Sequence, residues 1–237
     1  MFGEDDARWL NSKAMSDMDP SNLRAIGQEL MAAHKRRPGG LTIEVGTRKG
    51  GSAMLFAELL RLKYREPPPL WTVDPYGSKP YVDGVSTPLP LYHDAVEYLE
   101  MKRNLASYEF HTHWKMESGT FFRSLRDMTF WTVGSKDIVI TGGGKSMRMP
   151  IGEERSVEGA ATFILLDGEH SANSIIFQDL EPCINWLAPG GTVVIDNIDA
   201  DPETVPMLKH RVPEYFAMDA AGEDFSRTFA VLRKKTG

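Results

Sequence analysis

Apolar positions along the chain fall into two kinds of stretch, short continuous runs and longer segments with a helical period. Continuous runs are typical of strands that are buried on both faces of a parallel sheet. Helical periods are typical of helices that cover such a sheet with one face. The runs predict strands at residues 41–45, 70–74, 108–113, 162–167 and 192–195, and the periods predict helices at residues 19–37, 52–64, 93–105, 117–128 and 175–187. This alternation predicts a doubly wound α/β fold with a mostly parallel sheet.

Four segments stand outside this alternation. We expect residues 1–40 to form an N-terminal helical cap on one face of the sheet. Residues 75–91 are rich in Pro, Gly and Tyr without a period, which favours a loop over the pocket, a candidate lid. We interpret residues 129–160 as an inserted hairpin of unassigned role and residues 215–232 as a C-terminal antiparallel hairpin. Since nothing in the composition suggests a second domain, we expect residues 1–237 to form one.

The turn between the first strand and the next helix combines a carboxylate, glycines and a hydroxyl group. Glu44, Gly46, Gly50 and Ser52 lie in the sequence E-x-G-x-x-x-G-G-S, which is neither the dinucleotide fingerprint G-x-G-x-x-G nor the phosphate loop G-x-x-x-x-G-K-[ST]. Such a turn at a helix N-terminus offers backbone N–H groups and a positive dipole end to a ligand. A right-handed βαβ connection places Asp74, at the end of the second strand, beside this turn. The sequence therefore predicts a small-molecule pocket at the carboxyl edge of the sheet.

Composition and charge narrow the classes of function. The 237 residues are 41% hydrophobic and 25% charged, which is ordinary for a soluble globular protein. The formal net charge of −6 argues against a general nucleic-acid or anionic-membrane surface. The chain has no apolar run that could cross a bilayer, and its start is acidic where a secretory signal would be basic, so we expect a cytoplasmic protein. The single cysteine, Cys183, is expected to be a small buried hydrophobe.

Three motifs, taken in order, resemble those of one enzyme family. The turn E-x-G-x-x-x-G-G-S, the sequence LLDGEH at residues 165–170 and the sequence LAPGGTVVIDN at residues 187–197 are similar to motifs of class I S-adenosylmethionine-dependent methyltransferases. The resemblance covers residues 42–233. It is to the group that includes macrocin O-methyltransferase and cephalosporin-hydroxylase-like proteins, and more distantly to the catechol O-methyltransferases. It implies a Rossmann-like, seven-stranded sheet with a C-terminal antiparallel hairpin, and S-adenosylmethionine as the cofactor.

The resemblance also implies which residues bind the cofactor. They are Glu44, Gly46, Gly50, Ser52, Asp74, Ser118 and Asp167. In the family, an acid such as Asp74 accepts hydrogen bonds from both ribose hydroxyls, and Ser118, with Glu117 or Met116, stands where the adenine is contacted. Two alternatives stay open, namely that Asp74 is a loop carboxylate without a ligand and that Ser118 is a helix N-cap.

A second group of polar residues follows two neighbouring strands. Asp167, Asp196 and Asn197 supply two carboxylates and an amide oxygen, which suit Mg²⁺ or a similar divalent cation. The catechol-type family uses such a set to bind substrate oxygens. The alternative is that Asp167 caps the next helix and Asp196 bonds to a loop, without a metal. His170 stands where that family places a lysine base, so it is the candidate catalytic base, because a neutral imidazole with a pKa near ~6.5 could accept a hydroxyl proton. A purely structural His170 is the alternative.

These residues favour one function over two others. We expect an O-methyltransferase that acts on a hydroxyl of a small molecule, either a sugar-containing natural product or a phenol, with assistance from a divalent metal. The alternative is a hydroxylase component or a non-catalytic S-adenosylmethionine-binding protein. An NAD-dependent dehydrogenase is disfavoured by the missing fingerprint. His111 and His113 are expected to be packed or solvated rather than a metal pair. No nucleic-acid or membrane partner is expected, and a homo-oligomer is left open.

Overall fold

The computed structural model describes residues 18–76, 95–124, 129–142, 145–168, 171–217 and 228–236. Its helices are α2 (Pro20–Arg36), α3 (Gly51–Lys63), α4 (Ala95–Leu105), α5 (Ser118–Ser124), the π-helix η2 (Ser174–Leu180), α6 (Glu181–Cys183) and α7 (Thr204–Tyr215). Its strands are β1 (Leu41–Val45), β2 (Leu70–Val73), β3 (His111–Trp114), β4 (Thr129–Gly142), β5 (Lys145–Ser156), β6 (Ala161–Leu166), β7 (Leu187–Asp196), β8 (Phe216–Ala217) and β9 (Phe229–Lys234).

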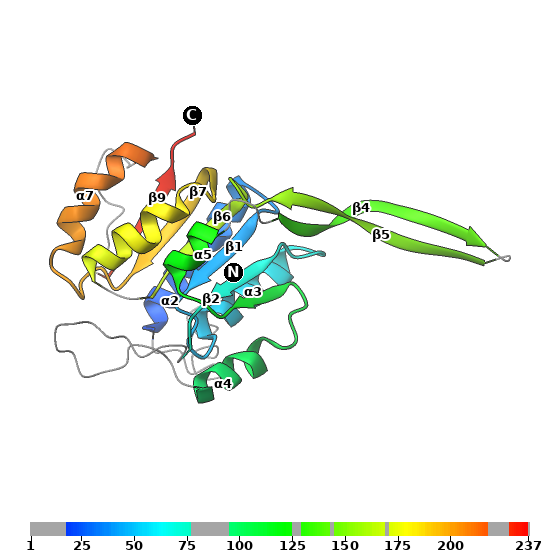
Figure 1. The fold of residues 1–237 in the computed structure, drawn as a ribbon, viewed down its shortest axis with the longest axis horizontal. Coiled ribbons are helices and arrows are strands. Elements are labelled where there is room, and N and C mark those ends of the chain that lie inside the picture. The colour runs from blue at the N-terminus through cyan, green and yellow to red at the C-terminus, as the bar shows by residue number, and fades with distance from the viewer. Residues whose placement is uncertain are drawn as a thin grey trace.

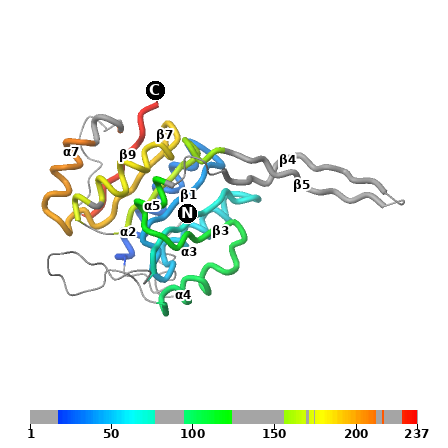
Figure 2. Tube along the Cα trace, viewed as in Figure 1, coloured from blue at the N-terminus to red at the C-terminus, as the bar shows by residue number. Residues whose placement is uncertain are grey.

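The main sheet has seven strands in the order β3-β2-β1-β6-β7-β9-β8 (Figure 1). The five strands from β3 to β7 in this order are paired in parallel, whereas β9 is antiparallel to both β7 and β8. In Figure 2 the red strand β9 accordingly lies beside the yellow strand β7. The prediction of a doubly wound, mostly parallel sheet with a C-terminal antiparallel pair is confirmed.

Helices cover both faces of this sheet, and each face has its own apolar core. On one face, residues of α2, α3 and α4 pack with Phe163 and Leu165 of β6. On the other face, residues of α5, η2 and α7 pack with Ile164 and Leu166 of the same strand. Since both faces of β6 are buried, its sequence is a continuous apolar run rather than an alternating one.

Helix α2 covers one face of the sheet, and local signals in the sequence determine where it begins. Asp19 is its N-cap and accepts a hydrogen bond from the backbone N–H of Ser21 at 2.8 Å, and Pro20 occupies the first turn. Leu23, Ile26 and Leu30 are fully buried against the sheet, as their spacing predicts. Among the described residues, no helix combines the length and the apolarity needed to cross a membrane.

Four elements differ from the predicted ones. The helix predicted at residues 175–187 is the π-helix η2 followed by the short α6, which ends at Cys183. The third strand begins at His111, three residues later than the predicted 108, because residues 105–108 form a turn in which the Tyr108 N–H donates to the Leu105 carbonyl. Residues 188–191, between the helix predicted at 175–187 and the strand predicted at 192–195, are part of β7, with a bulge where Ala161 pairs with Leu187 and Phe163 pairs with Thr192. Helix α7 occupies a stretch to which the sequence patterns assign no element.

The inserted segment is a hairpin, as predicted. Strands β4 and β5 pair only with each other within the described ranges and form a separate two-stranded antiparallel sheet (Figure 1). Their register shifts between Val133 and Asp137, which marks an irregularity in the ladder. The candidate lid at residues 75–91 falls almost entirely outside the described residues, since only its first two residues, Pro75 and Tyr76, are described.

Candidate active site

Four parallel strands bring the predicted site residues to one edge of the sheet. The ends of β1 and β2 lie side by side because Val45 pairs with Val73, and the ends of β6 and β7 do so because Leu166 pairs with Ile195. Val45 also pairs with Leu166, so all four ends are adjacent. In a doubly wound sheet this carboxyl edge is where ligands bind.

Gly46 lets the turn after β1 approach the turn after β6. Its φ angle is +84°, and a Cβ atom placed on it would lie 1.8 Å from the carbonyl oxygen of Asp167. Both features demand glycine, because side chains rarely adopt this φ and because no neighbouring side chain could move to relieve the contact. Gly50 also has a φ of +84°, and it starts α3. The two glycines thus shape a turn that joins the predicted cofactor residues to the predicted metal residues.

Glu44 lies beneath this turn in a fully buried position. One of its carboxyl oxygens accepts a hydrogen bond from the Ser52 hydroxyl, and the other, Oε2, is buried and has no hydrogen-bond partner in the described part of the chain. Burial raises the pKa of Glu44 to about 8, and the neighbouring Asp74 adds to this, although the Ser52 hydroxyl opposes it. A cationic group of a ligand would offset the cost of burying the ionised Glu44 carboxylate.

Asp74 follows β2 and reaches back to the same turn. Its Oδ2 accepts from the Arg48 backbone N–H at 3.0 Å and its Oδ1 from the Tyr76 backbone N–H at 3.2 Å. The side chain is buried, with 3% of its surface exposed. An ionised carboxylate offers about four acceptor positions, so a carboxylate that accepts from backbone N–H groups can also accept from ribose hydroxyls. The loop role and the cofactor role of Asp74 are therefore compatible.

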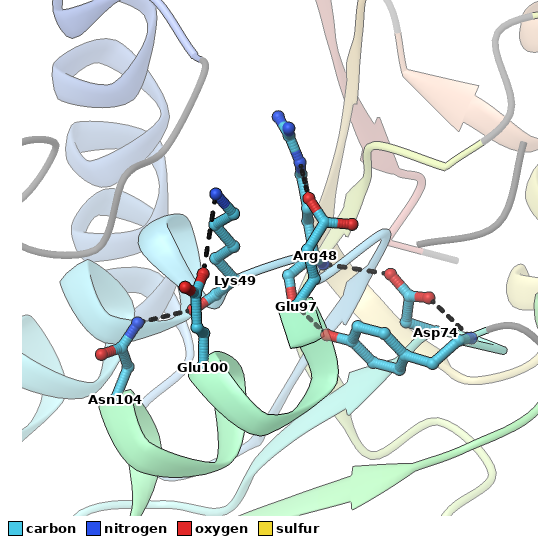
Figure 3. Close-up of polar contacts among 7 residues, drawn as sticks. Arg48, Lys49, Asp74, Glu97, Glu100 and Asn104 are labelled. Atoms are coloured by element: carbon cyan, nitrogen blue, oxygen red, sulfur yellow. Dashed lines mark hydrogen bonds and ion pairs between the residues drawn. The ribbon is translucent and has the colours of Figure 1, made fainter. Parts of the chain in front are cut away.

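Helix α4 contacts the turn from the other side (Figure 3). Arg48 forms an ion pair with Glu97, with Nε and Oε1 2.8 Å apart, and Lys49 forms a longer one with Glu100 at 3.6 Å. Asn104 donates from Nδ2 to the carbonyl oxygen of Lys49 at 2.8 Å. The glycine turn is thus held by side chains that are distant from it in sequence.

Ser118 is the first residue of α5, and Glu117 occupies the N-cap position. The preceding residue, Glu117, supplies the carbonyl that accepts from the Phe121 N–H at 2.9 Å, so the helix begins here. Ser118 is partly exposed. The alternative that Ser118 is the N-cap is therefore wrong by one residue, and its adenine-contact role stays a prediction.

The three predicted metal ligands lie together. Asn197 has a φ of +55°, a left-handed conformation that asparagine tolerates, and this turns its side chain toward both acids. Its Nδ2 is 3.2 Å from Oδ1 of Asp167 and 3.4 Å from Oδ2 of Asp196. Burial raises the pKa of Asp167 well above its usual range, with further contributions from the charges of Asp196 and Glu44. Burial likewise raises the pKa of Asp196 to about 6.

This donor set fits a hard divalent cation. Oδ1 of Asp196 is buried and makes no hydrogen bond within the described residues, so it has a free lone pair. Rotation of the Asn197 amide by half a turn would exchange its nitrogen for its oxygen. Among the described residues there is no group of three or more His, Cys, Asp or Glu side chains that could hold a metal, so the set depends on the amide as its third ligand.

The other predicted side chains have different outcomes. The candidate base His170 lies outside the described residues, and its role stays a prediction. His111 and His113 are packed, as expected, since both bond to the Thr72 hydroxyl at 2.9 Å. Burial lowers the pKa of each to about 4, so both are neutral at physiological pH. Cys183 is fully buried, as predicted.

Sequence reasoning missed the residues that hold the glycine turn from outside. Tyr76 is buried, and its hydroxyl donates to the Arg48 carbonyl. Because it lies in the stretch interpreted as a lid, nothing in the local sequence indicated a contact with the turn. Glu97 and Asn104 are polar positions on a helix, and their contacts depend on how α4 packs.

Comparison with known proteins agrees with this geometry. Residues 43–198 match the family model described as a methyltransferase domain. A search of curated proteins found no match to the sequence. Among solved structures, the O-methyltransferase from Bacillus cereus in complex with SAH is 12% identical with a TM-score of 0.57, and the match covers 98% of this chain and 90% of that one.

Two further solved structures share the fold. The O-methyltransferase NovP is 15% identical with a TM-score of 0.56, and the match covers 93% of this chain and 82% of that one. The O-methyltransferase TomG from Streptomyces achromogenes, in complex with SAM, is 13% identical with a TM-score of 0.53, over 98% of this chain and 89% of that one. Since the family model spans more than half of the sequence, the chain belongs to the methyltransferase domain family, as a class I S-adenosylmethionine-dependent methyltransferase.

Proposed function

We propose that this protein transfers the methyl group of S-adenosylmethionine to a hydroxyl oxygen of a small molecule, with assistance from a divalent cation. One observation carries the proposal: Asp167, Asp196 and Asn197 converge at strand ends that adjoin the glycine turn. A hydroxyl bound at these residues would lie next to a cofactor bound at the turn. TomG is described as involved in tomaymycin synthesis, which supports a natural product as the acceptor class.

The cofactor half of the proposal assigns a task to each residue around the turn. Glu44, with its unpartnered Oε2, attracts the ammonium group of the methionine part. Asp74 accepts hydrogen bonds from the ribose hydroxyls, and the N-terminus of α3, opened by Gly50 and Ser52, supplies backbone N–H groups and a positive dipole end. Ser118 contacts the adenine.

The acceptor half requires positioning and removal of one proton. The acceptor oxygen forms a bond to the methyl carbon while the methyl–sulfur bond breaks. The electron pair of the broken bond stays on the sulfur, which yields S-adenosylhomocysteine. The hydroxyl proton goes to a base, for which His170 is the candidate. Asp167, Asp196 and Asn197 would hold the cation, which supplies positive charge that favours the ionised form of the acceptor. Most of the acceleration then comes from the alignment of oxygen, methyl group and sulfur.

Two measurements test this function in sequence. Calorimetric titration with S-adenosylhomocysteine should show binding, and tight NAD binding in its place would refute the cofactor assignment. Transfer of a labelled methyl group from S-adenosylmethionine to a panel of phenols and sugar hydroxyls should then require Mg²⁺ and stop in excess chelator. Cofactor binding without transfer to any acceptor would favour the non-catalytic alternative.

A pair of variants separates the metal role from a general loss of charge. Asp196→Asn should abolish most metal-dependent transfer while it leaves the affinity for S-adenosylhomocysteine within about twofold, because Asp196 lies on the acceptor side. Asp199→Asn is the matched control, since Asp199 is an exposed aspartate three residues further along the chain. Full activity of Asp196→Asn would remove the metal set from the mechanism.

A further inference from the structure

The glycine turn contains a residue with an unusual backbone conformation between Gly46 and Gly50. Arg48 has a φ of +46°, which lies in the left-handed region that side chains other than glycine rarely adopt. Gly46 and Gly50 take positive φ angles without steric cost, but an arginine loses about 1–2 kcal/mol there. Contacts from outside the turn must therefore hold Arg48 in this conformation.

Two successive carbonyl groups of the turn are bound by side chains from separate elements. The Tyr76 hydroxyl, beyond the end of β2, donates to the carbonyl oxygen of Arg48. The Asn104 amide, on α4, donates to the carbonyl oxygen of Lys49 at 2.8 Å (Figure 3). A trans peptide is planar with its C=O and N–H groups on opposite sides, so each bond also fixes the direction of the N–H that follows. The backbone of the turn is thus set in place before any ligand arrives.

Tyr76 and Arg48 also connect the turn to Asp74. Tyr76 donates its backbone N–H to Asp74, and Asp74 accepts in turn from the Arg48 N–H. Arg48, Asp74 and Tyr76 therefore form a closed ring of three hydrogen bonds, with the Tyr76 hydroxyl bond as its third side. Burial and the charge of Asp74 raise the pKa of Tyr76, so its hydroxyl remains protonated and able to donate.

We infer that Tyr76 and Asn104 are positioning residues, which hold the Arg48 and Lys49 carbonyls so that the turn is pre-organised for S-adenosylmethionine. This inference rests on the proposed cofactor site. Neither side chain needs to touch the cofactor, because each acts through the turn. Loss of either bond lets the turn leave its binding conformation, and binding must then supply the cost of ordering it.

The test compares two tyrosines of the full chain. Tyr76→Phe removes only the hydroxyl that binds the Arg48 carbonyl. Tyr98→Phe is the matched control, because the Tyr98 ring lies 5.0 Å from that of Tyr76 while its hydroxyl bonds to no other described residue. Calorimetric titration with S-adenosylhomocysteine should show about two- to tenfold weaker binding for Tyr76→Phe, as expected from the net value of one hydrogen bond, and no change for Tyr98→Phe.

A second variant tests the other carbonyl. Asn104→Asp keeps the shape of the side chain but replaces the donor by a carboxylate oxygen, which repels the Lys49 carbonyl, so binding should weaken at least as much. Thermal unfolding of each variant separates positioning from stability, since a purely structural role lowers the melting temperature and leaves affinity measured well below it unchanged. Wild-type binding with unaltered affinity in both variants would overturn the inference. No binding by the wild type would instead refute the proposed cofactor site.

Discussion

Replacement of Gly46 by alanine tests the close approach of the glycine turn to Asp167. The structure gives two separate costs for this change. The φ of +84° costs an alanine about 1–2 kcal/mol. In addition, the new Cβ would lie 1.8 Å from the Asp167 carbonyl oxygen and 2.4 Å from its carbon, and both atoms belong to the backbone. Displacement of backbone in a packed region costs about 1–3 kcal/mol more, so we expect a total of about 2–5 kcal/mol.

Gly39 supplies a matched control for the first cost. Its φ is +77°, and a Cβ atom there would meet nothing within 4 Å. Gly39→Ala should therefore lose only the conformational cost of about 1–2 kcal/mol. For a domain of this size, 1 kcal/mol corresponds to about 2–4 °C of melting temperature. The melting temperature should fall further for Gly46→Ala than for Gly39→Ala.

The affinity for S-adenosylhomocysteine should differ more between Gly46→Ala and Gly39→Ala than their stability does. Gly46→Ala pushes the glycine turn away from Asp167, so titration with S-adenosylhomocysteine at a temperature where the variant is folded should show little or no binding. Gly39 precedes β1 and Gly46 follows it, so Gly39 lies at the opposite end of this strand, and Gly39→Ala should bind as the wild type does. Equal stability losses in the two variants, with wild-type affinity in Gly46→Ala, would refute the close-approach argument.

Three further predictions concern charge. Asp74→Asn should weaken S-adenosylhomocysteine binding by about 10- to 100-fold in calorimetry, since bonds to a charged acceptor contribute about 1.5–3 kcal/mol, and unchanged affinity would leave Asp74 as a loop residue. The pKa of Glu44 is raised from 4.5 to about 8, so the stability that its protonated form contributes is complete below 4.5 and is lost as the pH rises through 8; urea unfolding of Glu44→Gln should lack this loss. The pKa of buried His34 is lowered from 6.5 to about 4, so its contribution is present above 6.5 and is lost as the pH falls toward 4, and His34→Gln should show a flatter acid limb in the same assay.

Much of the fold follows from signals that are local in sequence. Continuous apolar runs marked β1, β2 and β6 because both sheet faces are covered. The start of the third strand was predicted too early because five of the seven residues at 108–114 are aromatic or histidine, and such a run does not reveal where pairing begins. Helix α7 was not predicted because Pro206 lies in its first turn. Proline is tolerated there in the structure, but in a sequence pattern it indicates a helix break.

The site was predictable where the topology alone determines proximity. Asp74 and Asp167 follow parallel strands and Asp196 ends one, and the parallel pairing places such residues at one edge. Tyr76 and Asn104 could not be found in this way. Their partners are backbone carbonyls, which carry no sequence signal, and the contacts depend on the packing of α4 against the turn.

The electrostatics of the edge explain why these elements must act together. Glu44, Asp167 and Asp196 lie at three adjacent strand ends, and burial raises the pKa of each. Buried carboxylates are costly unless a positive charge accompanies them. S-adenosylmethionine carries an ammonium and a sulfonium, and a divalent cation would bring two further charges, so the ligands of the proposed reaction are the partners that these carboxylates lack. A rigid turn is then required, since attraction between buried charges favours the reaction only when the glycine turn holds the cofactor at a fixed distance from the acceptor residues.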